Sequence, residues 1–341
     1  MTDEHWPLDQ LGHFACGSGI HVEASCCGAS FATRIGGFVA KIQFPVLSTP
    51  WQRAKLEAPS SFAVDPAIPL ADEREPHQEW GVVSQWRTQV GASEQEPVSV
   101  RVQRLGFTIV DRFHEREGIA QIHKDTPAVL DRWWDLFCAW VSILSTQDPR
   151  DHLRLQGAAR RDPVWMWVGG GKERRGQTVS SDAIRWDRTG TPLDPATVET
   201  CMYLAGTEES PPTEWLFVRD ARSAVAAGDY RRAVIDAGTA AELAITELLD
   251  QHLSAVEEAV AEALMSRSRA LEQRSKLMKE LGAGFIPDGF AGTLQRPRNA
   301  AAHSGQAPTL EVAQGAIAVA VALLEQSTPL LALVPAELAS E

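Results

Sequence analysis

Cysteine, asparagine and long apolar runs are scarce in this sequence. The five cysteines are irregularly spaced and include the adjacent pair Cys26-Cys27, which argues against a disulfide framework. No Cys-x-x-Cys occurs, so we expect no structural zinc site and interpret the cysteines as buried, reduced thiols. The remaining residues show no metal-ligand spacing either, and the sequence predicts no metal and no cofactor.

Apolar runs long enough to span a bilayer, about eighteen residues, are missing. Residues 310–334 come closest, but Glu311, Gln314, Glu325 and Gln326 interrupt them, which favours a buried or interface helix. The first residues carry Asp3 and Glu4 and lack the basic region of a secretion signal. We therefore expect a cytoplasmic protein with no membrane partner.

The chain is acidic, with a formal net charge of −13, and this argues against a passive nucleic-acid coat. Its charge is unevenly distributed. Between Leu264 and Ala300, seven basic residues stand against three acidic ones. A phosphate-bearing ligand would favour that arrangement, although a solvated helix face would also produce it.

Size and composition are those of a globular protein large enough for two domains: 341 residues, 44% hydrophobic and 23% charged. In the first two hundred residues, several segments either alternate apolar with polar residues or are rich in β-branched residues, which predicts strands. These segments are 21–23, 30–44, 80–90, 98–110, 164–168 and 177–179. Gly36-Gly37 predicts a bulge or a tight turn that joins two of them. The segment 169–176 predicts a hairpin turn whose tip, with Lys172, Arg174 and Arg175, could touch a nucleic acid or a partner.

One helix interrupts these strands. Thr126-Pro127 resembles a helix start, and apolar residues then recur at helical spacing to Leu144. Six tryptophans of this domain lie on or near that helix and the strands that follow: Trp133, Trp134, Trp140, Trp165, Trp167 and Trp186. Base stacking is one use for them. We favour the interpretation that these tryptophans pack in the core.

Residues 206–213 have linker composition, and the pattern beyond them is helical throughout. We predict helices from Thr213 to about Ala227, from Gly228-Asp229 to about Leu253, from about Val256 to Leu281, around 296–304, and from Thr309 onward. The fold class is therefore α+β. A mixed, strand-rich α/β domain occupies 1–205, a linker 206–213, and an up-and-down helical bundle 214–334.

The most informative stretch is Arg296-Pro-Arg-Asn-Ala-Ala-Ala-His-Ser-Gly305, which holds Asn299, the single asparagine of the chain. On an α-helix, residues four apart share a face, so Asn299 and His303 are expected to lie together with Arg298 beside them. Ser304-Gly305 predicts the end of that helix. Pro297 leaves two arrangements open: the helix begins at Pro297, or it is kinked there.

The pattern Arg-Asn-x-x-x-His resembles the Arg, four to six residues, His signature of the HEPN superfamily, the small helical domains of many prokaryotic ribonucleases, toxins and antiviral effectors. Residues 228–242, Gly-Asp-Tyr-Arg-Arg-Ala-Val-Ile-Asp-Ala-Gly-Thr-Ala-Ala-Glu, are similar to the second helix of bacterial HEPN proteins. The resemblance covers roughly residues 211–331. It implies a HEPN-like helical bundle and a homodimer in which two motifs face one groove.

By resemblance, Arg298 stabilises charge on the phosphate, His303 acts as general acid or base, and Asn299 positions the phosphate or the imidazole. Arg296, Lys276 and Lys279, from the locally basic segment, are candidates to bind the substrate. Two carboxylates of the second predicted helix, Glu242 and Asp236, are candidates to hydrogen-bond the motif, and of these Glu242 matches the family position.

The resulting hypothesis is a metal-independent HEPN endoribonuclease that acts on RNA as a toxin or antiviral effector. It would dimerise through the helical domain, while a protein or phage-derived trigger acts on the N-terminal domain. One alternative is a catalytically inactive HEPN module for binding or assembly. Another is a helical scaffold whose chemistry lies in the first domain, although no Ser-His-Asp, paired-carboxylate or metal pattern identifies a rival centre there.

Overall fold

The structure, a computed structural model, describes residues 6–48, 55–60, 80–88, 95–113, 116–147, 161–168, 175–182, 191–336 and 338. It divides the chain into two compact units, Met1–Ser210 and Pro211–Glu341. Their boundary falls inside the predicted linker 206–213. The first unit is rich in strands and the second is helical, so the mixed α+β composition is confirmed.

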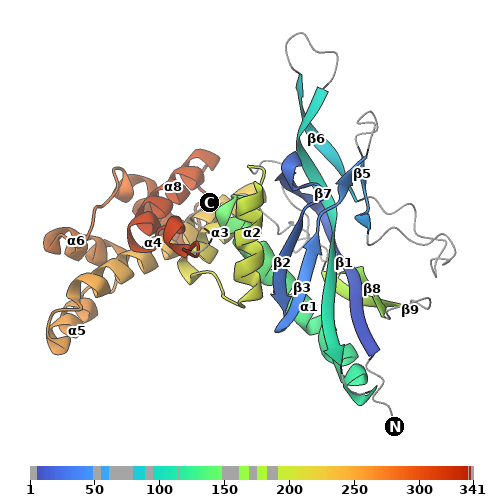
Figure 1. Cartoon of the computed structure of the whole chain (residues 1–341). Coiled ribbons are helices and arrows are strands. Elements are labelled where there is room, and N and C mark those ends of the chain that lie inside the picture. The colour runs from blue at the N-terminus through green and yellow to red at the C-terminus, as the bar shows by residue number, and fades with distance from the viewer. Residues whose placement is uncertain are drawn as a thin grey trace. The chain divides into compact units, whose positions relative to one another are not determined.

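An antiparallel, seven-stranded sheet forms the framework of the first unit (Figure 1). Its strands are β1 (Trp6–Glu23), β2 (Ser30–Ile35), β3 (Phe38–Gln43), β6 (Gly81–Thr88), β7 (Gln95–Phe113), β8 (Arg161–Val168) and β9 (Arg175–Asp182). The order is β2-β3-β7-β1-β8-β9, and β6 also pairs with β7. A separate two-stranded sheet joins β4 (Val46–Leu47) and β5 (Leu56–Glu57).

The predicted turn between β2 and β3 is confirmed. Gly36 and Gly37 both have positive φ, 58° and 85°, the conformation that a two-residue hairpin turn requires and that glycine adopts at little cost. Ile35 and Phe38 pair across it. The predicted tip of the β8–β9 hairpin, with Lys172 and Arg174, lies outside the described residues.

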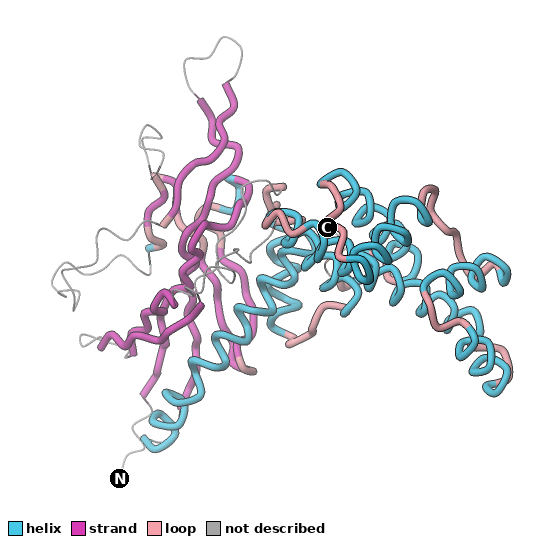
Figure 2. The backbone as a smooth tube through the Cα atoms, turned by 180° about the vertical axis from the view of Figure 1, so that it is seen from behind, coloured by secondary structure: helices cyan, strands magenta, loops and turns pink. Residues whose placement is uncertain are grey.

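Helix α1 (Arg116–Leu144) follows β7 and begins well before the predicted start at Thr126-Pro127. That prediction was wrong because the upstream residues are themselves good helix formers. Pro127 therefore costs one backbone hydrogen bond inside the helix and does not open it. Figure 2 shows α1 running alongside the sheet, and α2 (Pro195–Gly206) packs on both α1 and β2.

Aromatic side chains fill the space between α1 and the sheet. The Phe14 ring of β1 stacks on Trp134 with a centroid separation of 4.7 Å, and the Trp133 and Phe137 rings stack at 5.4 Å. Trp133, Trp134 and Trp140 are all buried, which confirms core packing for these three tryptophans. The side chains of Trp165, Trp167 and Trp186 lie outside the described part. All five cysteines are free and four are buried, whereas Cys27, also expected to be buried, is partly exposed.

The second unit is a helical bundle built around α4. Its helices are α3 (Thr213–Ala226), α4 (Tyr230–Leu253), α5 (Glu258–Arg267), α6 (Leu271–Leu281), α7 (Arg296–Asn299) and α8 (Leu310–Ser327), followed by a short 3-10 turn at Leu330–Leu333. Helix α4 packs against α3, α6 and α8. Apolar residues that recur along α4 at helical spacing form its inner face and are all buried: Val234, Ala237, Ala241, Ile245, Leu248 and Leu249.

The single helix predicted from Val256 to Leu281 is wrong, because the chain breaks between α5 and α6. Ser268 leaves the helical conformation, with φ −113° and ψ 59°. Two arginine side chains bind the carbonyls there: Arg269 Nε donates to Ser266 O at 3.1 Å, and Arg274 Nε donates to Ser268 O at 3.1 Å. Such side-chain-to-backbone bonds compete with the helical ladder.

Helix α8 begins as predicted, with the Thr309 side chain accepting a hydrogen bond from Val312 N. Within the described residues it is the one helix that is long and apolar enough to cross a membrane. Seven of its residues are buried, and it packs against α3 and α4. A core helix of a bundle has these same properties, which agrees with the first alternative of the buried or interface helix predicted from the sequence.

Candidate functional site

The Arg-Asn-x-x-x-His motif lies on one continuous helical segment, residues 290–304, which we call the motif helix. Helix α7 forms its centre, and π-helical turns flank it at Phe290–Gln295 and Ala300–Ser304. Gly305 ends the segment with φ 67°, as predicted. π-Helical turns are rare and occur frequently at functional sites.

Pro297 lies inside the motif helix, so the helix does not begin at the proline. Just before the proline, Arg296 N donates to Ala291 O, five residues back instead of four. A proline ring in a regular α-helix clashes with the carbonyl four residues earlier, and the wider turn relieves such a clash. The sequence thus predicted a disturbance at Pro297, and the structure places it as a π-turn.

The π-turn also changes which motif residues share a face. In an α-helix, Arg298 and His303 would lie roughly 140° apart around the axis, since each residue advances by about 100°. The wider turn over Ala300–Ser304 advances by less per residue, which brings these two side chains nearer to one face. Asn299 and His303 are exposed and Arg298 is partly buried. Within the described chain, the His303 side chain has no hydrogen bond or ion pair.

The Arg298 side chain lies against Gly238 of α4. A Cβ atom added at position 238 would lie 2.5 Å from Arg298 Cγ, so only glycine leaves room for the arginine in this position. The guanidinium donates from Nη1 to Asn299 Oδ1 at 3.3 Å, and its Nη2 lies 3.7 Å from Glu242 Oε2. Its Nε is buried without a hydrogen-bond acceptor in the described structure. The guanidinium is therefore held in place, and N–H groups of its two Nη atoms keep donor capacity for an anion.

Glu242, a predicted supporting residue, lies between two guanidiniums. Besides its ion pair with Arg298, it accepts a hydrogen bond from Arg274 Nη1 at 3.3 Å through Oε1. The same Nη1 donates to Thr246 Oγ1 at 2.7 Å. Sequence reasoning assigned no role to Arg274, because its partner lies 32 positions away on another helix.

Arg231, also missed from the sequence, fixes the backbone of the motif helix. Its Nε donates to Ala301 O at 2.8 Å, a carbonyl inside the π-turn. Arg231, Gly238 and Glu242 are spaced by seven and four residues, so they share one face of α4. That face of α4 contacts the motif helix at three points. Arg231 binds its backbone, Gly238 lies under the Arg298 side chain, and Glu242 pairs with the Arg298 guanidinium.

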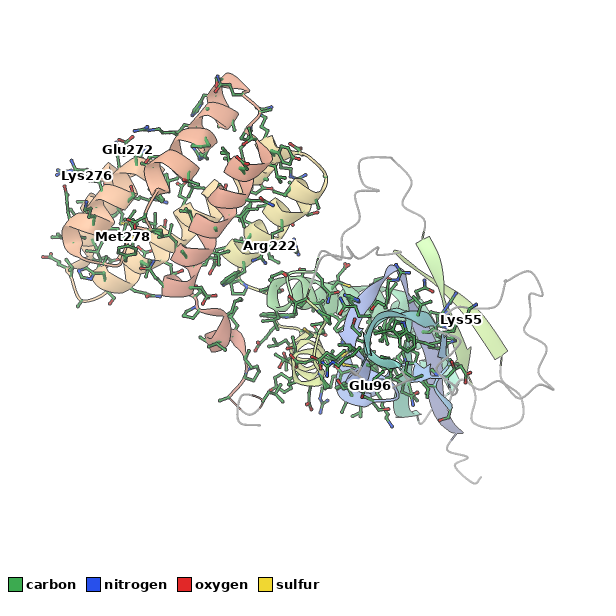
Figure 3. All side chains as sticks on the ribbon, turned by 90° about the horizontal axis from the view of Figure 1, so that it is seen from above. Lys55, Glu96, Arg222, Glu272, Lys276 and Met278 are labelled. Atoms are coloured by element: carbon green, nitrogen blue, oxygen red, sulfur yellow. The ribbon has the colours of Figure 1, made fainter. Side chains whose placement is uncertain are left out.

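The other predicted residues are not gathered at this point. Asp236 forms its ion pair with Arg232, 3.3 Å away, and burial raises the pKa of its carboxyl. Lys276 projects from the outer side of α6, where it pairs with Glu280 at 3.8 Å (Figure 3). Lys279 and Arg296 are exposed, and no described contact links either side chain to Arg298.

A second polar cluster lies in the sheet of the first unit. His21 Nε2 and Ser84 Oγ are 2.6 Å apart, and Ser99 Oγ lies 3.1 Å from Ser84 Oγ. Ser84 occupies an irregularity in the pairing of β6 with β7, a feature that re-aims side chains. Gln147 clamps the His21 backbone by accepting from its N–H and donating to its carbonyl. Because these residues are far apart in sequence, no sequence motif predicted the cluster.

Neither unit shows a group of three or more His, Cys, Asp or Glu side chains placed to hold a metal ion within the residues described. Burial raises the pKa of the Cys26 and Cys27 thiols to about 12, which disfavours the reactive thiolate. The arrangement with the clearest chemical capacity is thus the anchored Arg298 beside exposed Asn299 and His303. Comparison of the chain with protein-family models, with curated proteins and with solved structures finds no match.

Proposed function

We propose that the helical unit is a metal-independent HEPN-type endoribonuclease that cleaves RNA through Arg298, Asn299 and His303. One observation carries the proposal. The Arg298 side chain is held on Gly238 with Glu242 beside its guanidinium, and an exposed amide and imidazole lie on the same short helix. An anion with several oxygens, such as a phosphodiester, satisfies that set of donors.

Cleavage in this site needs no group beyond the RNA and the protein. The 2′-oxygen attacks the adjacent phosphorus and loses its proton to a base, while the bond from phosphorus to the 5′-oxygen breaks and that oxygen takes up a proton. The products are a 2′,3′-cyclic phosphate and a 5′-hydroxyl. Arg298 stabilises the negative charge that grows on the phosphoryl oxygens, and Asn299 holds the phosphate or the imidazole.

His303 is exposed, so its imidazole can reach a bound RNA and act as a general acid or base. One imidazole cannot serve as base and acid in the same step. We therefore propose a homodimer through the helical unit, in which two copies of the motif face one groove and supply one histidine each.

A cytoplasmic ribonuclease of this kind must be restrained until it is needed. We propose that it acts as a toxin or antiviral effector and that the strand-rich unit receives the trigger, a protein or a phage-derived molecule. The division of the chain into a sheet-based unit and a helical unit supports a separation of sensing from cleavage.

A non-catalytic HEPN module for binding or assembly is the second candidate. The observation that favours it is the isolation of His303: within the described chain no side chain orients its ring, whereas catalytic bases are usually oriented by a third group. A third candidate is a helical scaffold with the chemistry in the first unit, where the contact between Ser84 and His21 favours it.

Incubation of RNA with the purified chain in EDTA separates these candidates. We expect wild type to cut, Arg298→Ala and His303→Ala to lose at least a hundredfold in rate, and His252→Ala to cut normally. His252 is an exposed histidine at the end of α4 and serves as the matched control. Equal behaviour of all four proteins would rule out the ribonuclease and leave the binding or scaffold candidates.

A further inference from the structure

The carboxylate of Glu242 poses an electrostatic problem for the proposed site. It lies 3.7 Å from the guanidinium nitrogen of Arg298 that is to bind a phosphate. A carboxylate so close neutralises the cation and repels an incoming phosphodiester. The site therefore needs something that offsets the charge of Glu242 without blocking Arg298.

Arg274 meets that requirement. Its side chain is only partly exposed and is committed to three acceptors on two sides: Ser268 O through Nε, and Thr246 Oγ1 and Glu242 Oε1 through Nη1. These contacts hold the guanidinium at the far oxygen of the Glu242 carboxylate. Arg298 Nη2, by contrast, lies 3.7 Å from the other oxygen, beyond hydrogen-bond distance.

We propose that Arg274 is a positioning residue that neutralises Glu242, so that Arg298 can leave this carboxylate and bind the phosphate of the substrate. The inference rests on the proposed phosphodiester-binding role of Arg298. When RNA enters, Glu242 keeps its partner at Oε1 and is not left as an unpaired, partly buried charge. Without Arg274, the negative charge of Glu242 would be uncompensated, and it would hold Arg298 more tightly and repel the phosphate.

The competing explanation is structural, because Arg274 also ties the break between α5 and α6 to α4. Charge distinguishes the two. If Arg274 acts by neutralising Glu242, its loss is harmful only while Glu242 is charged, and Glu242→Gln removes the harm. If Arg274 acts as a tie, the loss of its bonds to Thr246 and Ser268 persists whatever residue stands at 242.

The experiment compares wild type with Arg274→Gln, Arg274→Lys, Glu242→Gln and the double variant Glu242→Gln/Arg274→Gln. Arg267→Gln is the control, since it removes one positive charge from the same basic segment at an exposed position on α5. Two quantities are measured for the full chain: the Kd of a 2′-O-methyl RNA oligonucleotide, which cannot be cut, and kcat and KM for cleavage of its 2′-hydroxyl counterpart. Circular dichroism checks the helix content.

We expect Arg274→Gln to weaken oligonucleotide binding about tenfold and to raise KM more than it lowers kcat. The double variant should recover to within about threefold of wild type, Glu242→Gln should bind at least as tightly as wild type, and Arg274→Lys should fall between. Arg267→Gln should match wild type. Recovery in the double variant is the result that a purely structural tie cannot produce.

Two results overturn the inference: an Arg274→Gln variant indistinguishable from Arg267→Gln, or a folded double variant as weak as Arg274→Gln. Should Arg274→Gln fail to fold, Thr246→Val takes its place, because this variant removes one acceptor of Arg274 Nη1. Thr246→Val should weaken oligonucleotide binding by less than Arg274→Gln, and Glu242→Gln must also reverse that loss. The failure of the ribonuclease proposal looks different. In that case no variant cuts RNA, while the order of oligonucleotide affinities still decides the role of Arg274.

Discussion

Arg298 and Gly238 lie in direct contact across the interface between the motif helix and α4. A Cβ atom at 238 would come within 2.5 Å of Arg298 Cγ and 3.3 Å of its Cβ. Glycine in a helix interior costs about 1 kcal/mol relative to alanine. Its presence at 238, in the middle of α4, is explained by the arginine that lies on it.

Replacement of Gly238 by alanine tests this relationship. We expect Gly238→Ala to displace the Arg298 side chain and to lower RNA cleavage at least tenfold, while higher helix propensity offsets the steric strain and leaves the urea midpoint little changed. The control is Gly292→Ala in the motif helix, where an added Cβ meets no atom within 4 Å. Normal cleavage by Gly238→Ala would show that the observed Arg298 position is not needed.

Arg231 should stabilise the π-turn of the motif helix. Arg231→Ala removes the hydrogen bond to Ala301 O, and we expect a loss of about 1 kcal/mol in the free energy of unfolding together with reduced cleavage. Urea denaturation and the RNA cleavage assay measure the two effects. Arg267→Ala, an exposed arginine on α5, is the comparison and should change neither. If cleavage survived a confirmed loss of stability, anchoring of Ala301 would be irrelevant to the site.

Asp236 makes stability depend on pH. Burial raises the pKa of its carboxyl above the unfolded value, and this outweighs the opposing effect of Arg232. The folded state therefore holds its proton to higher pH, so the contribution of Asp236 to stability falls as pH rises through the unfolded and then the folded pKa.

Asp236→Asn removes that dependence. Its free energy of unfolding should exceed that of wild type at pH 7, and the difference should shrink as pH falls and vanish below the unfolded pKa of about 4. Urea titrations at pH 7, 5 and 3, followed by the helical circular dichroism signal, measure it. Asp250→Asn, at an exposed position of the same helix, serves as the control. A pH-independent difference would assign the effect to something other than ionisation.

The Ser84–His21 contact is expected to stabilise the sheet and to take no part in RNA cleavage. Ser84→Ala should cost about 1 kcal/mol in the first unit, since it removes a 2.6 Å hydrogen bond that links β6 to β1. RNA cleavage should be unchanged. Ser25→Ala, which removes a hydrogen bond to the exposed Glu23, should alter neither property. Loss of cleavage in Ser84→Ala would move the chemistry to the strand-rich unit.

Local patterns in the sequence were sufficient for much of the secondary structure. The apolar spacing of α4 determined its buried face, Thr309 marked the start of α8, and Gly36-Gly37 and Gly305 marked turns, because each depends on neighbours within a few residues. Local rules failed where longer-range effects compete, as at Pro127 inside α1 and at Ser268, where two arginine side chains bind the backbone.

The chemical groups of the candidate site could be predicted from the sequence, since Arg298, Asn299 and His303 lie within six positions of one another. The contacts that hold these groups in place could not be predicted. Arg231 reaches a carbonyl 70 positions away, Gly238 lies under Arg298, and Glu242 joins two arginines from different helices. Only tertiary packing decided these relationships, because which faces of two helices meet depends on the whole bundle and not on the spacing within either helix.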